Sequence, residues 1–170
     1  MKRILILTLI AGLITSFNAS AQQDKSKRPS LPAKISQTLS SGAEVSIDYS
    51  QPSLKGRTLA TLAPNGKRWR TGANEATVFE ISKDVKIEGQ TLPAGKYSVY
   101  TIPGEDEWTI IFNKTWNQWG LSYDEAQDAL RVKVKPGKSP SVVETMTFNI
   151  DKGGKVSLAW ADTQVDFKVQ

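Results

Sequence analysis

Neither histidine nor cysteine occurs in the 170 residues of this sequence. Without them, Ser-His-Asp and Cys-His nucleophilic sites cannot be built, and the usual ligands of zinc and copper are missing. Disulfides cannot form either, so the fold must be stabilised by packing alone. The sequence also lacks the glycine-rich loops that hold phosphates or dinucleotides. We therefore expect no metal site and no cofactor.

The first residues have the three parts of a secretory signal peptide. Met1–Arg3 is positively charged, residues 4–17 are mainly apolar, and Ala19-Ser20-Ala21 has the small residues of a cleavage site. The apolar run is shorter than the roughly 20 residues that a membrane-spanning helix needs. The pattern predicts a signal peptide over residues 1–21, cleavage after about Ala21, and no stable membrane anchor after cleavage.

The net charge of +5 belongs to the start of the chain, because residues 35–170 contain 16 basic and 16 acidic residues. A neutral domain lacks the basic surface expected of a nucleic-acid-binding protein, so we expect no nucleic-acid partner. Residues 22–34 are polar and contain Pro29 and Pro32. This composition predicts a flexible linker before a single domain over residues 35–170.

Apolar and polar residues alternate repeatedly through this domain, which predicts β-strands. The strands are expected at residues 44–50, 77–82, 97–102, 107–112, 130–135, 143–150, 156–160 and 165–169, with hairpin turns at 151–154 and 161–164. This spacing favours an all-β fold, an antiparallel β-sandwich of jelly-roll or immunoglobulin-like type. One short helix is predicted near residues 122–130, where Ser122 and Glu125 fit a capping box.

The stretch over residues 49–77 is long, rich in glycine and proline, and weak in strand pattern. Up to Asn74 it contains five basic residues and no acid. Long ordered loops in compact domains commonly carry function. One hypothesis is a clamp for a carboxylate, a phosphate or an acidic sugar, formed by Arg57, Trp69, Arg70, Asn74 and Glu75. The alternative is that Arg57 and Arg70 pair with acids of neighbouring strands and hold the loop in place.

Four tryptophans outside this stretch divide into two kinds. Trp108 and Trp160 alternate with core residues and are expected to pack inside the domain. Trp116 and Trp119 lie in a polar segment beside amide side chains, a composition suited to a sugar or peptide groove. The interpretation we prefer for the second pair is that the rings fold back and plug one end of the sandwich.

Carboxylates are the remaining groups for acid–base chemistry. A small hydrolase such as a glycosidase would need two of Asp48, Glu75 and Glu80 to lie roughly 5–10 Å apart in a cleft. The sequence alone brings no two of them together. Surface carboxylates on an amphipathic sheet are the simpler interpretation.

Several motifs of this sequence can be compared with those of a known family. They are Asp48-Tyr49-Ser50, residues 69–77 (WRTGANEAT), Leu92-Pro93-Ala94-Gly95 and Asn117-Gln118-Trp119-Gly120. Together they resemble the DUF2911 family of exported bacterial proteins, found mainly in Bacteroidetes, over about residues 35–169. The resemblance implies a periplasmic or secreted location and no known catalytic residue. Gln51 departs from the family pattern, which has a basic residue there, so the anion clamp loses one candidate charge.

Three functions stay open at this point. The first is a non-enzymatic module that binds an acidic or carbohydrate-like ligand, a small molecule or glycan, with Trp116 and Trp119 at the rim of its site. The second is the carboxylate-dependent hydrolase. The third is a structural or assembly partner in the cell envelope, which a broad exposed apolar patch would mark.

Overall fold

The computed structural model describes residues 24–170. The predicted signal peptide lies outside these residues. No helix of the described part is long and apolar enough to cross a membrane. The elements are η1 (Lys25–Lys27), β1 (Leu31–Thr38), β2 (Glu44–Gln51), α1 (Leu59–Leu62), β3 (Thr77–Ile81), β4 (Val85–Ile87), β5 (Gln90–Leu92), β6 (Gly95–Ile102), β7 (Trp108–Asn113), η2 (Glu125–Gln127), β8 (Asp128–Val134), β9 (Pro136–Ile150) and β10 (Lys155–Lys168).

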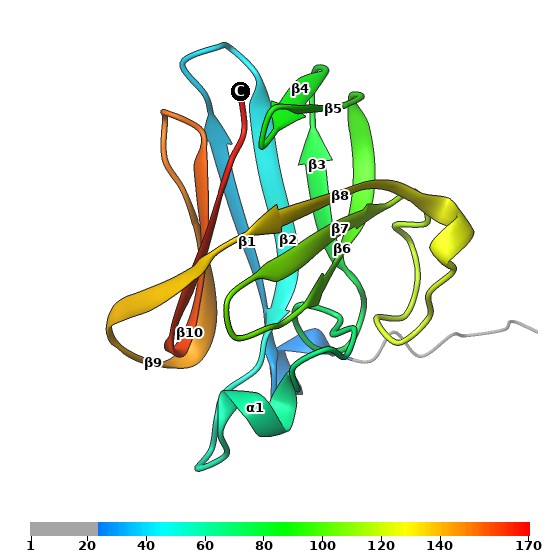
Figure 1. Cartoon of the computed structure of the whole chain (residues 1–170). Helices are drawn as coiled ribbons and strands as arrows, with labels where there is room; N and C mark the ends of the chain where they lie inside the picture. The colour runs from blue at the N-terminus through cyan, green and yellow to red at the C-terminus, as the bar shows by residue number, and fades with distance from the viewer. Residues whose placement is uncertain (1–23) are drawn as a thin grey trace, which may run out of the picture.

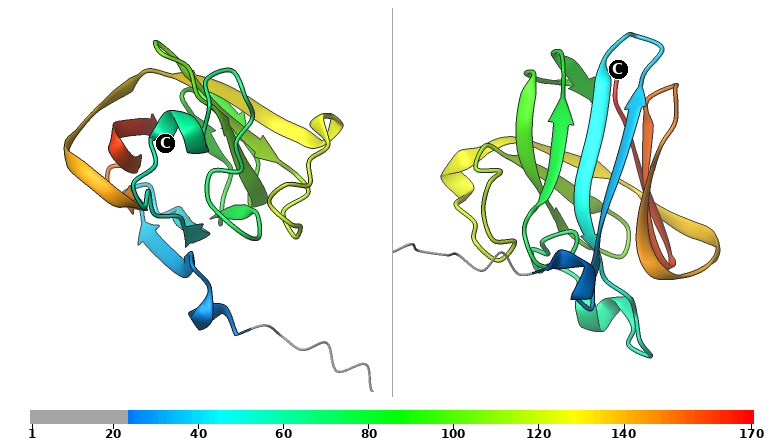
Figure 2. Two further views of the ribbon diagram at one scale, coloured as in Figure 1. Left: turned by 90° about the horizontal axis from the view of Figure 1, so that it is seen from below. Right: turned by 180° about the vertical axis from the view of Figure 1, so that it is seen from behind.

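Six of the strands form one antiparallel sheet in the order β1-β2-β3-β6-β7-β8, and β9–β10 and β4–β5 form two separate hairpins (Figure 1). The sheet is curled, and the β9–β10 hairpin lies beside β1 both in Figure 1 and in the view from behind (Figure 2). Backbone hydrogen bonds join this hairpin to the segment after β2, from Met146 N to Pro52 O and from Leu54 N to Glu144 O, both 3.0 Å. The strands thus surround one core.

The core forms because apolar residues occupy alternate positions of each strand and therefore share one face. Three phenylalanines meet at its centre: the ring of Phe79 lies 5.2 Å from that of Phe112 and 6.1 Å from that of Phe167. Phe79 and Phe112 have no exposed surface. The three phenylalanines come from β3, β7 and β10, so this cluster attaches the β9–β10 hairpin to the sheet.

The expected all-β, antiparallel fold is confirmed, and so is the turn at 151–154. The sheet order is sequential once the β4–β5 hairpin is set aside, and this order does not identify the jelly-roll or immunoglobulin-like type. The turn expected at 161–164 is wrong, because β10 runs straight through it. Ala161 has a φ of 55° and the pairing of β10 with β9 shifts on both sides of it, so these polar residues form a bulge.

Two other expectations are corrected. Residues 31–34 of the expected linker pair with residues 48–51 and begin β1. Proline is tolerated there because β1 is the edge strand of the sheet. The helix expected near 122–130 is only the 3-10 turn η2, capped by Asp124 instead of Ser122, because β8 already begins at Asp128. A short α-helix, α1, forms instead within the 49–77 stretch, where Thr58 caps it.

The phenylalanine cluster allows a test of the core. Replacing Phe79 with alanine removes a ring that has no exposed surface and should lower the free energy of unfolding by about 3–5 kcal/mol. Phe79→Leu retains most of the volume and should cost about 1 kcal/mol. Urea denaturation followed by circular dichroism measures both changes. Equal losses in the two variants would contradict a packed cluster at this position.

Candidate functional site

Trp69 is the residue that fixes the cationic stretch on the domain. Its ring is buried and stacks on Trp160 with centroids 5.3 Å apart. Its backbone pairs with Thr101 through two hydrogen bonds of 2.7 and 2.9 Å. The neighbours of a buried residue in an extended segment point to the opposite side. Arg68 and Arg70 are therefore directed away from the core.

Three arginines line a hollow of about 340 Å³ on this side of the molecule. Arg57, Arg68 and Arg70 share it with apolar groups that include Trp69 and Leu121, and no carboxylate lines it. Within residues 24–170, none of the three arginines takes part in an ion pair. The alternative in which Arg57 and Arg70 pair with acids is therefore wrong. We call this site the arginine hollow.

Backbone carbonyls hold two of these arginines in place. The Arg57 guanidinium donates to Leu54 O at 2.9 Å and to Ser53 O at 3.0 Å. Arg70 Nε donates to Gly72 O at 3.3 Å, and burial lowers the pKa of Arg70. A buried cation is stabilised by an opposite charge, and the described part of the chain supplies none here.

The third arginine, Arg68, was not among the predicted site residues. Its guanidinium carbon lies 4.0 Å from the centre of the Tyr123 ring and 5.3 Å from that of Tyr100, so cation–π attraction positions it. The pKa of Tyr123 is raised to about 12 by burial and by its hydrogen bond to Asp128. The spacing of Arg68 and Arg70 around the buried Trp69 was the signal that could have found Arg68.

Gln51, the position that departs from the family pattern, does not line the arginine hollow. Its side-chain amide donates to Met146 O at 3.1 Å instead. The missing basic residue therefore removes no charge from the lining of this hollow.

Two other predicted residues, Asn74 and Glu75, contact the N-terminal segment and do not line the arginine hollow. The Asn74 amide donates to Ser30 O at 3.2 Å. Arg28 Nη1 contacts both carboxylate oxygens of Glu75 at 2.7 and 2.9 Å, and Lys25 Nζ lies 3.3 Å away. These cations, Arg28 above all, lower the pKa of Glu75 from 4.5 to about 2. The five residues of the expected clamp therefore do not form one site: the two arginines and Trp69 line the arginine hollow, whereas Asn74 and Glu75 do not.

Trp116 and Trp119 line a second hollow of about 480 Å³, together with Asp48, Glu75 and residues of β1 and β2. Their side chains are 39% and 49% exposed. The preferred expectation that these rings plug one end of the domain is therefore wrong. We call this second hollow the tryptophan groove.

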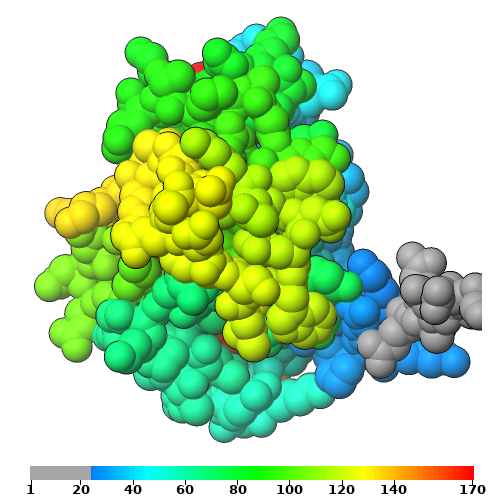
Figure 3. Space-filling view, turned by 90° about the vertical axis from the view of Figure 1, so that its right-hand side faces the viewer, coloured from blue at the N-terminus to red at the C-terminus, as the bar shows by residue number. Residues whose placement is uncertain are grey.

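The 114–127 loop lies against the 69–77 segment (Figure 3), and each of these segments contributes to both hollows. Gly120 N donates to Asn74 O, and Ala76 N donates to Gln118 O, both at 3.0 Å. A Cβ atom on Gly120 would lie 2.8 Å from Asn74 O and 2.8 Å from Arg70 Cδ. Only glycine allows the two backbones to approach this closely.

These segments are also those that carried the resemblance described above. A family model described as a protein of unknown function, DUF2911, matches residues 30–169. The chain belongs to the DUF2911 family. No curated protein and no solved structure matches the chain.

Two of the three candidate carboxylates of this DUF2911 protein lie in one groove, but both of them form ion pairs with basic residues. Asp48 and Glu75 line the same groove, but Glu80 lines a different hollow. Asp48 pairs with Lys34 at 2.9 Å. Glu75, with a pKa of about 2, is ionised at neutral pH and cannot donate a proton as a general acid must.

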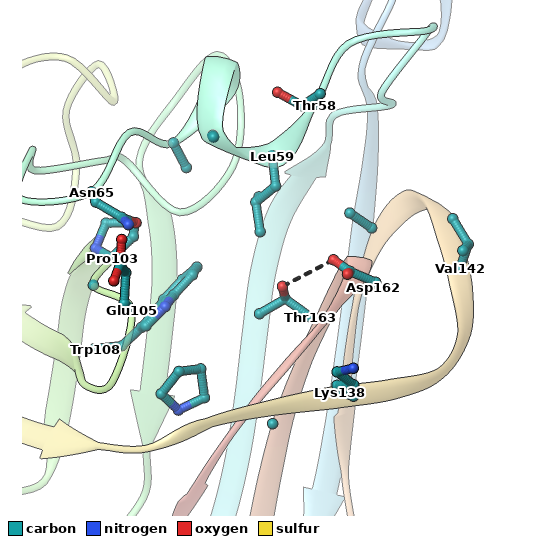
Figure 4. A pocket seen from close by; sticks show the side chains of 16 residues that line it. Thr58, Leu59, Asn65, Pro103, Glu105, Trp108, Lys138, Val142, Asp162 and Thr163 are labelled. Atoms are coloured by element: carbon teal, nitrogen blue, oxygen red, sulfur yellow. Dashed lines mark hydrogen bonds between the residues drawn. The ribbon is translucent and has the colours of Figure 1, made fainter.

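A larger hollow of this DUF2911 protein, about 810 Å³, lies elsewhere, between α1 and the β9–β10 bulge (Figure 4). Leu59, Trp108 and Val142 contribute apolar surface to it, and Asp162 and Lys138 contribute charges of both signs. None of the predicted site residues lines it. Because its charges are mixed, they do not select a class of ligand.

The Glu75 ion pair predicts a pH-dependent contribution to stability. The folded-state pKa lies below the unfolded one, so the contribution is present above pH 4.5 and is lost as the pH falls towards 2. Because 40% of the Glu75 side chain is exposed, solvent limits the effect, and Glu75→Gln should cost about 1 kcal/mol at pH 7. Urea denaturation should show this difference shrinking at pH 3. A difference that is the same at both pH values would contradict the ion pair.

Proposed function

We propose that this DUF2911 protein is a non-enzymatic ligand-binding module that binds an anionic ligand in the arginine hollow. The observation that carries the proposal is the gathering of Arg57, Arg68 and Arg70 around one hollow that no carboxylate lines. The ligand class is a small molecule or glycan with a carboxylate or phosphate group. We further propose that the module is a β-sandwich, formed by the curled sheet and the β9–β10 hairpin, and that it acts in the periplasm or outside the cell.

The geometry of the arginines supports an anion as ligand. Three like charges around one hollow repel one another, and an anion between them offsets this repulsion because it attracts each of the three. Guanidinium groups also bind carboxylates and phosphates through two parallel hydrogen bonds. Arg57 and Arg70 are already held by backbone carbonyls, so little side-chain freedom is lost on binding.

The lining of the hollow adds an apolar contribution. Trp69, Leu62 and Leu121 lie beside the arginines, and pockets of this kind combine apolar walls with a few polar groups that orient the ligand. A volume of about 340 Å³ suits a small molecule or the end of a longer chain. An organic acid or an acidic sugar fits this combination better than a bare inorganic ion.

The two other functions have less support. The hydrolase needs a carboxylic acid that stays protonated near neutral pH, and Glu75 is held ionised. The envelope partner needs a broad apolar patch. The five exposed large apolar residues of the described chain do not line one common surface: Trp116 and Trp119 line one hollow, Leu121 a second and Val142 a third, and Leu31 lies at the start of β1.

Arg70→Ala is the sharpest test of the arginine hollow. Citrate, inorganic phosphate and a short oligogalacturonide are titrated into the protein, and binding is measured by calorimetry and by tryptophan fluorescence, since Trp69 lines the hollow. A charge-assisted contact contributes about 1.5–3 kcal/mol, so Arg70→Ala should weaken binding roughly 10- to 100-fold. Arg70→Lys should recover part of the loss, because it restores the charge without the planar guanidinium.

Lys67→Ala is the matched control. It removes the same charge from the same segment, and Lys67 is exposed and does not line the hollow. Its affinity should stay within about twofold of the wild type, because exposed charges are screened by salt. Absence of binding for all three anions, or equal losses in Lys67→Ala and Arg70→Ala, would falsify the proposal.

A further inference from the structure

We infer that the tryptophan groove is a second binding site, separate from the arginine hollow, and that it takes an uncharged glycan chain. The chain would lie along the outer face of β1, β2 and β3, with sugar rings against Trp116 and Trp119. Three observations support this inference: the exposure of two anchored rings, the pairing of the charges in the groove, and the polar rows that continue from it along the sheet.

The first observation is that hydrogen bonds hold the loop in place although its tryptophans are exposed. Ser98 Oγ donates to Thr115 O at 2.9 Å, and Thr115 N donates to Asn113 Oδ1 at 3.0 Å. Gln118 is held through both its backbone and its side chain. Its backbone oxygen accepts from Ala76 N, and its side-chain amide donates to the Tyr100 hydroxyl at 3.0 Å. The loop therefore owes its conformation to hydrogen bonds and not to burial of the two tryptophan rings.

A loop that is held in place and exposes tryptophan favours binding by these rings. The rings need not be ordered when a ligand arrives, so the entropic cost of binding is small. Lys96 Nζ lies 5.0 Å from the centre of the Trp116 ring, and this contact positions the ring through cation–π attraction. An amphipathic aromatic surface of this kind offers apolar contact to the C–H face of a sugar.

The second observation is that the charged groups of the groove are paired. Asp48 contacts Lys34, and Glu75 contacts Arg28 and Lys25. The groove thus differs from the arginine hollow, where no acid accompanies the arginines. A charged ligand would gain little here, whereas hydroxyl groups can donate to carboxylate oxygens that have capacity for further hydrogen bonds.

The third observation is the continuation of the groove along the sheet. In the register of the strands, Lys34 is opposite Asp48, which is opposite Val78 on β3. The next row on the same face consists of Ser36, Ser46 and Glu80. This row lines another hollow, of about 520 Å³. Two hollows on one face of three strands suit an extended chain better than a single small molecule.

The test uses neutral hexasaccharides as probes: cellohexaose, xylohexaose, maltohexaose and mannohexaose. Calorimetry should show that the protein binds at least one of them. Aromatic contacts contribute about 0.5–1.5 kcal/mol each, so Trp116→Ala and Trp119→Ala should each weaken binding roughly 2- to 13-fold. Trp119→Phe should keep part of the affinity, since it retains an aromatic face.

Leu121→Ala is the matched control, because Leu121 is an exposed apolar residue of the same loop that lines the arginine hollow instead. This variant and Arg70→Ala should both bind the hexasaccharide as the wild type does. The site is overturned if no hexasaccharide binds, or if the two tryptophan variants bind like the wild type. Loss of hexasaccharide binding in Arg70→Ala would overturn the separation of the two sites. Anion binding lost in Arg70→Ala but kept in both tryptophan variants supports the separation.

Discussion

The close approach of Gly120 to the backbone of Asn74 and Glu75 is the contact on which the candidate region depends. It joins two loops that are far apart in the sequence. The chain neighbours of Gly120 and Asn74 line the two hollows, Ala73 and Leu121 the arginine hollow and Glu75 and Trp119 the tryptophan groove. A side chain at position 120 would overlap Asn74 O and Arg70 Cδ. The absence of one Cβ atom therefore allows Arg70 and the backbone of Asn74 to lie directly against the 114–127 loop.

The N-terminal segment is ordered by charge more than by apolar burial. Residues 25–28 have little apolar surface to bury, yet Arg28 is half-buried against Glu75, and Asn74 holds Ser30. Once these contacts position the segment, residues 31–38 can pair with β2 as the edge strand. Glu75 also lines the tryptophan groove, where its ion pairs with Arg28 and Lys25 leave its charge compensated. One set of ion pairs thus both positions the N-terminal segment and balances the charge of the groove.

The strands could be predicted from sequence because their alternation reflects burial on a single face, as in β2 and β8. The strand β1 was not predicted, since it contains a proline, none of its side chains is fully buried, and it is ordered by pairing with β2. The bulge at Ala161 was mistaken for a turn, because residues 161–164 have the polar composition that turns and bulges share. At the site, the sequence did reveal the cationic stretch. It did not reveal that the arginines line one hollow while Glu75 lines another. This division involves the contact of Gly120 with Asn74, two residues that only the fold brings together.

The distribution of charge explains how a domain of low net charge can contain a cationic site. Residues 35–170 have equal numbers of acids and bases, and the structured residues 24–34 add four bases and one acid, which leaves a net charge of +3 on residues 24–170. Some of the acids are used in local pairs, such as Asp128 with Arg131 and Glu107 with Lys133, and none of the acids lines the hollow that the three arginines share. Recognition at this hollow therefore relies on the local group of arginines, through hydrogen bonds and the fit of a planar anion. A cleft lined by charges of one sign attracts an opposite charge, and salt screens this attraction, so raising the salt concentration should slow the association of the anion.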